Sequence, residues 1–107
     1  MTLSPWLIFL LAAILEVAGD AIIRRGLHGA GVVFIALGFL VLGSYGILVN
    51  TVRWDFSKLL GVYVAVFAVV SVVCGRFLFK DQVPSSTWIG LAIIVAGGLV
   101  IQSGNPL

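Results

Sequence analysis

The sequence predicts an all-helical integral membrane protein with four transmembrane helices joined by short links. Its 107 residues are 62% hydrophobic and only 9% charged, with a mean hydropathy of +1.26, whereas soluble domains carry about 25% charged residues. The apolar residues form four runs, each close to the roughly 20 residues that a spanning helix needs. Because these runs are continuously apolar and do not alternate, a β-barrel is excluded.

We expect one four-helix transmembrane domain over residues 1–107, with helices at about 5–23, 30–52, 59–79 and 85–102. The tryptophans support this division, since indole rings favour the membrane–water boundary and each lies at the end of an apolar run: Trp6, Trp54 and Trp88. The links are only long enough to reverse the chain, so successive helices should be antiparallel neighbours.

The basic residues lie at the ends of the apolar runs, as membrane anchors do. Four flank the first and third links, Arg24, Arg25, Arg76 and Lys80, and two flank the second, Arg53 and Lys58. This bias weakly favours a cytoplasmic location of the odd links, in a bacterial inner membrane. If Arg24 belongs to the helix, the bias shrinks and both orientations are allowed.

Charge and composition argue against several classes of function. A net charge of +2 is too small for a nucleic-acid surface, and the single Cys74 allows neither an intrachain disulfide nor a CxxC metal site. The chain has no nucleophile–base pair and no glycine-rich phosphate loop. We therefore expect no enzyme activity, no cofactor and no metal.

The stretch "LLAAILEVAGDAIIRRG" places an acid in the middle of the first run. Glu16 follows Trp6 by 10 residues, which is about 15 Å along a helix and half of a ~30 Å hydrocarbon core. Acids at that depth usually mark an ion or substrate pathway. The alternative is a protonated carboxyl group that hydrogen-bonds to a neighbouring helix.

Asp20 and Arg24 follow Glu16 at successive intervals of four residues, so all three share one helix face. Asp20 could form an ion pair with Arg24 near the membrane boundary, or it could contribute to binding. Both interpretations stay open from the sequence.

The second and third runs contain polar side chains that need partners inside a membrane. Ser44, Tyr45 and Asn50 could line a binding cavity or tie helices together. Tyr63 is a binding-site candidate only if a carboxylate from another helix faces it, and is otherwise an interface anchor.

The fourth run carries small residues and no charge, which indicates a role in assembly. Small residues let helices approach closely, and the candidates for a dimer interface are Gly90, Ala92, Ala96 and Gly97. The spacing allows packing within the monomer as well as between monomers.

Three segments resemble the small multidrug resistance family of the drug/metabolite transporter superfamily: "LEVAGDAIIRR", "GRFLFKDQVPSSTWIG" and "GLAIIVAGGLVI". The resemblance matches Glu16, Gly19 and Arg24 to the acid, glycine and basic residue of that family's first helix, and the third segment to its dimer-forming fourth helix. Two positions depart from the family pattern. The third run, "GVYVAVFAVVSVV", has no tryptophan, and Asp20 replaces a small hydroxyl residue.

The first functional hypothesis is a proton-coupled exporter of small cationic or amphipathic compounds. Two Glu16 side chains, one from each subunit of a homodimer, would face a shared cavity where a proton and a cation compete. An antiparallel dimer would supply the inverted repeat that transporters commonly use. A heterodimer with a similar chain is the other possible assembly.

Two further hypotheses remain open. As a flippase subunit for an anionic lipid carrier, the chain would use its basic residues, Arg24 among them, to attract a lipid phosphate. As a non-transporting helper of a larger membrane complex, it would not need the charge of Glu16.

Overall fold

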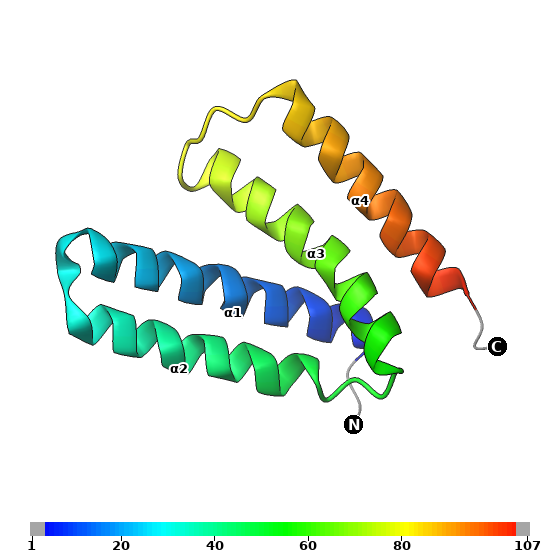
Figure 1. Ribbon diagram of the computed structural model, residues 1–107, viewed down its shortest axis with the longest axis horizontal. Helices are drawn as coiled ribbons and strands as arrows, with labels where there is room; N and C mark the ends of the chain where they lie inside the picture. The colour runs from blue at the N-terminus through cyan, green and yellow to red at the C-terminus, as the bar shows by residue number, and fades with distance from the viewer. Residues whose placement is uncertain (1–3, 105–107) are drawn as a thin grey trace. The chain divides into compact units, whose positions relative to one another are not determined.

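The computed structural model describes residues 4–104 and shows four long helices (Figure 1). They are α1 (Pro5–Arg25), α2 (Val32–Val49), α3 (Phe56–Phe77) and α4 (Ser85–Ser103), and a short π-helical turn, η1 (Gly26–Ala30), follows α1. The described residues contain no strand. All four long helices are long and apolar enough to cross a membrane, so the predicted all-helical membrane fold is confirmed.

The chain divides into two compact units, Met1–Arg53 and Trp54–Leu107. The first unit is a hairpin in which α1 packs against α2, and the second is a hairpin in which α3 packs against α4 (Figure 1). In both hairpins the two helices run antiparallel, as the short links predict.

The first link is more helical than expected. α1 begins with Pro5 in its first turn, where a missing N–H costs nothing. At its other end the chain continues into η1, and the regular helix is broken only at His28 and Gly29. Gly29 and Gly31 have positive φ angles of 125° and 96°, which glycine adopts without the steric cost of a β-carbon. These two glycines make the reversal into α2.

The second link has the expected length but lies three residues earlier in the chain, where polar side chains end α2. The side chain of Asn50 donates a hydrogen bond to the carbonyl of Gly46 (2.8 Å), and that of Thr51 donates one to Leu48 (2.6 Å). The last carbonyls of a helix need such partners. As a result α2 ends at Val49 and not near residue 52, while α3 begins at Phe56 and not near residue 59.

Two glycines mark the closest approach of α1 and α2. A β-carbon added at Gly19 would lie 2.8 Å from the Leu42 side chain and 3.3 Å from the Gly38 carbonyl oxygen. A β-carbon added at Gly38 would overlap the Ile23 side chain and lie 3.0 Å from the Gly19 carbonyl oxygen. The two backbones can therefore meet only because both positions lack a side chain.

In the second unit, α3 and α4 meet near the start of α3 and the end of α4. A β-carbon at Gly98 would lie 2.6 Å from the Ala65 β-carbon, and one at Gly61 would lie 2.9 Å from the Ile101 side chain. Small residues again set the distance between the two helices.

Many large apolar side chains cover the outside of the helices. Ile47, Ile93 and Val100 are 75%, 67% and 71% exposed, which would be unfavourable in water but suits contact with lipid. Together with the four span-length helices, this surface identifies a multi-pass membrane protein.

Candidate functional site

Glu16 lies near the middle of the 21-residue helix α1 and is half-buried. At 1.5 Å per residue it is about 16 Å from the first residue of the helix. If α1 crosses the membrane along its length, this carboxyl group lies near the centre of the bilayer. It is therefore the acid in the chain with the greatest expected depth.

The face of α1 that carries Glu16 is the face that contacts α2. Gly19 lies three residues after Glu16, and Ile23 lies seven residues after it, a spacing that keeps all three on one side of a helix. Both Gly19 and Ile23 lie against Gly38 of α2. Tyr45 follows Gly38 by seven residues on the antiparallel helix. The Glu16 carboxylate also acts electrostatically on Tyr45, so these two side chains are the candidates for a site between α1 and α2.

Asp20 belongs to the same group. It is exposed one turn beyond Glu16, and its carboxylate also acts electrostatically on Tyr45, less strongly than that of Glu16 does. Arg24 is exposed in the last turn of α1. Within residues 4–104 the structure contains no ion pair between Asp20 and Arg24, and a role of Asp20 in binding stays a prediction.

Ser44 and Asn50 lie on α2 and at its end, but their hydrogen bonds stay within the helix. The Ser44 hydroxyl donates to the carbonyl of Leu40 (3.0 Å), and the Asn50 amide caps the helix as described above. Both side chains are exposed. These bonds satisfy their polar hydrogens locally, and the structure does not bring them to Glu16 through a hydrogen bond.

Tyr63 belongs to the second unit. It is buried on α3, and its ring lies 6.3 Å from that of Phe67. Within this unit its ring packs beside that of Phe67, and its role in a binding site stays a prediction.

The small residues proposed for a dimer interface lie on α4 away from the packed contact with α3. Ala92, Ala96 and Gly97 are exposed, and β-carbons added at Gly90 or Gly97 would meet nothing within 4 Å. Gly98 is the residue that packs against α3. This part of α4 is therefore free for contact with lipid or with another chain.

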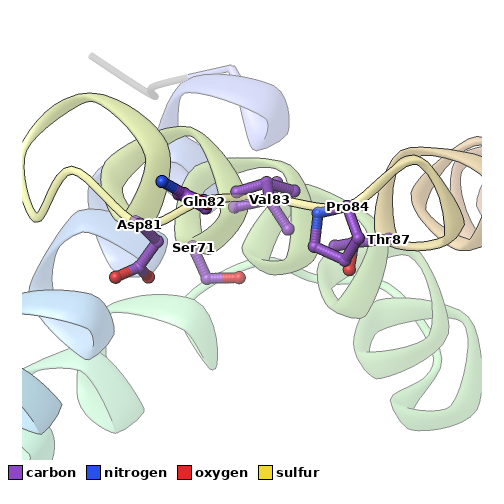
Figure 2. Close-up of a pocket in the computed structure, with 8 residues that line it drawn as sticks. Ser71, Asp81, Gln82, Val83, Pro84 and Thr87 are labelled. Atoms are coloured by element: carbon purple, nitrogen blue, oxygen red, sulfur yellow. The ribbon is translucent and has the colours of Figure 1, made fainter.

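The described residues contain no group of three or more His, Cys, Asp and Glu side chains that could hold a metal ion. They do contain a cavity that the sequence did not predict, in the second unit between α3, the link after it and the start of α4 (Figure 2). The only sequence signal for this cavity is the polar character of the link "KDQVPS".

The model of the family described as "Uncharacterised BCR, YnfA/UPF0060 family" matches residues 2–106 of the chain. Among curated relatives, a UPF0060 membrane protein of Staphylococcus carnosus is 34% identical over 92% of both chains. One of Mycolicibacterium vanbaalenii is 32% identical over 96% of this chain and 98% of the relative. A third, of Synechocystis, is 26% identical over 98% of both. No solved structure matches the chain.

Proposed function

This chain belongs to the YnfA/UPF0060 family of membrane proteins, and from that premise we propose that it is a proton-coupled transporter exporting small organic cations. The observation that carries the proposal is the position of Glu16. Its carboxyl group is half-buried at the middle of α1, on the face toward α2, and it acts electrostatically on Tyr45, as Asp20 does.

An ionised carboxylate at the centre of a membrane costs several kcal/mol unless it has a partner. A proton removes the charge, and a bound organic cation compensates it. Since both act on the same carboxylate, they compete, and this competition is sufficient for exchange of one for the other. When neither a proton nor a cation is bound, the Tyr45 hydroxyl can donate a hydrogen bond to the Glu16 carboxylate.

The assembly that we propose is a dimer that packs through the small residues of α4, the pair Gly90 and Gly97 or the pair Ala92 and Ala96 on the opposite side of the helix. Four spans are few for a transporter, and two copies of opposite orientation would form an inverted repeat. Two observations support this assembly: the open space around Gly90 and Gly97, and the resemblance of the first and fourth helices to small multidrug resistance transporters.

The decisive experiment is proton release from the purified protein on addition of a series of alkylammonium and aromatic cations. We expect the wild type to release protons when a substrate binds, and Glu16→Gln to release none while remaining folded. Asp55→Asn is the matched control, because Asp55 is an exposed acid immediately before α3. If Glu16→Gln releases as many protons as the wild type, the proposal is wrong and Asp20 becomes the leading candidate.

A second candidate function is the flipping of an anionic lipid carrier. It is favoured by the exposed pair Arg24 and Arg25 at the end of α1, where arginine can attract a lipid phosphate at the membrane surface. A strain lacking the gene distinguishes the two functions. Sensitivity to organic cations supports export, whereas a defect in envelope glycans supports flipping.

A further inference from the structure

The cavity in the second unit has a volume of about 470 Å³, within the ~300–1,000 Å³ typical of small-molecule sites. Figure 2 shows its labelled residues, with Asp81 and Ser71 at one end and Pro84 and Thr87 at the other. The cavity lies where α3 ends and α4 begins. In a chain whose helices span the membrane, that level is the membrane–water boundary.

The backbone of the link places Asp81, whose side chain is exposed, at the edge of the cavity. Lys80 adopts a left-handed conformation with φ of 57°, which reverses the chain, and the Asp81 N–H then donates a hydrogen bond to the carbonyl of Gly75 (2.8 Å). The carboxylate rests over Gly75, where a β-carbon would lie 2.9 Å from Oδ2. Gly75 is therefore needed for the carboxylate to take this place.

The polar side chains at the Asp81 end of the cavity offer more acceptors than donors: the Asp81 carboxylate and the Ser71 hydroxyl oxygen accept, and the Gln82 amide can accept or donate. Asp81 is the only charged residue in the lining. The Ser71 hydroxyl uses its hydrogen in a bond to the carbonyl of Ala68 (2.9 Å), so its lone pairs remain to accept a hydrogen bond. Such an arrangement suits a cationic donor and not an anion.

The positively charged groups near the cavity leave its Asp81 end available to a cation. The Arg76 guanidinium lies over the Phe77 ring at 5.4 Å, Lys80 is exposed, and neither lines the cavity. The amino end of α4 carries a partial positive charge and disfavours a cation beside Thr87. A cation would therefore bind at the Asp81–Ser71 end, with its apolar part toward Val83 and Pro84.

We propose that this cavity binds an ammonium group, with Asp81 as its counter-ion and Ser71 as a hydrogen-bond acceptor. The group can belong to a soluble amine or to the head group of phosphatidylethanolamine, since both offer ammonium hydrogens at the membrane boundary. This site is separate from Glu16 and does not depend on the transport function proposed above.

The test is a titration of the full chain, in phosphatidylcholine nanodiscs and carrying Glu16→Gln, with ethylammonium. Binding is followed by NMR at the backbone amides of Val72 and Thr87, with ethanol as the neutral probe of similar size. Since a hydrogen bond to a charged group is stronger than one between neutral groups, we expect Asp81→Asn to weaken ethylammonium binding by about tenfold or more. Ethanol should not bind.

Two controls match the two polar groups. Asp55→Asn removes an exposed acid at the other end of α3 and should leave the affinity unchanged. Ser71→Ala should weaken binding, whereas Ser103→Ala should not, because the Ser103 hydroxyl makes the same type of bond, to Val100 (2.9 Å), outside the cavity.

Gly75→Ala keeps the charge of Asp81 but displaces its carboxylate, and should also weaken ethylammonium binding. The proposal is overturned if Asp81→Asn binds ethylammonium as tightly as Asp55→Asn, or if ethanol shifts the same amides equally.

Replacing phosphatidylcholine with phosphatidylethanolamine identifies the source of the ammonium group. A lower apparent affinity for soluble ethylammonium indicates competition from the lipid head group, and an unchanged affinity indicates a soluble amine. Because these titrations use Glu16→Gln protein, binding at Asp81 and proton release at Glu16 succeed or fail separately.

Discussion

At the scale of single residues, the Tyr45 hydroxyl is the group of α2 on which both Glu16 and Asp20 of α1 act electrostatically, and we propose that it donates a hydrogen bond to the Glu16 carboxylate. Tyr45→Phe removes only this hydroxyl, and the loss of one hydrogen bond costs about 0.5–1.5 kcal/mol. We expect cation affinity to fall by about three- to tenfold, while substrate still releases protons because Glu16 is intact. Equilibrium binding of a radiolabelled cation measures the change.

The matched control for this prediction is Ser44→Ala. Ser44 is adjacent to Tyr45, but its hydroxyl donates to the carbonyl of Leu40 and should not affect cation binding. An equal effect of both substitutions would contradict a specific role for Tyr45.

The sequence predicted the position of Glu16 in its helix, but it did not predict which groups interact with the other candidate residues. The depth of Glu16 follows from its distance to Trp6, because helical rise is constant. Asp20, by contrast, had Arg24 as its nearest cation in the sequence, whereas its charge also acts on Tyr45, which depends on how α1 packs against α2. Ser44 and Asn50 could not be assigned from a pattern, since short polar side chains often bond to their own backbone.

At the scale of helices, the crossing of Gly19 and Gly38 sets the distance between α1 and α2. Gly38→Ala would place a β-carbon against Ile23 and the Gly19 carbonyl. We expect a loss of about 1–3 kcal/mol in the free energy of unfolding, as for other overpacked sites, measured by denaturation in sodium dodecyl sulfate. Gly43→Ala is the control: nothing lies within 4 Å of its added β-carbon, so it should be neutral or slightly stabilising.

The exposed small residues of α4 give a second prediction at this scale. If they form the dimer interface, Ala96→Leu and Gly97→Leu should weaken self-association, because a large side chain blocks close approach. Dilution in detergent followed by crosslinking measures the dimer fraction. Ile47→Leu, on the exposed surface of α2, is the control. Mutants that keep the wild-type dimer at every concentration would exclude α4 as the interface.

The existence of the helices was predictable, but their ends were less so. Long apolar runs are an unambiguous signal for spanning helices, whereas the end of α2 depends on the bonds that Asn50 and Thr51 make to nearby carbonyls. Likewise the apolar residues from Phe77 to Phe79 favoured a longer α3. The helix nevertheless ends at Phe77, before the reversal at Lys80.

At the scale of the whole molecule, four spans predict that both termini lie on the same side of the membrane. Reporter proteins fused to each terminus should give the same location within one molecule, and termini on opposite sides would contradict the four-span topology. Because the basic residues differ by only four to two between the links, we expect both orientations to be populated. A single orientation in every molecule would argue against an antiparallel homodimer.

The fold class could be derived from hydropathy because a membrane leaves few alternatives to helices. The cavity at the third link could not. It depends on the path of a few residues between α3 and α4, and that path depends on Lys80, a residue with no special preference for left-handed conformation.

The left-handed conformation of Lys80 also couples the shape of the link to membrane insertion. A lysine in this conformation costs roughly 1–2 kcal/mol relative to the ordinary regions, and glycine at this position would remove that cost. It would also remove a positive charge, reducing the bias between the links from four against two to three against two. Glycine at position 80 would thus favour the local backbone but weaken the charge bias, so a substitution that relaxes the link should shift the ratio of the two orientations in the bilayer.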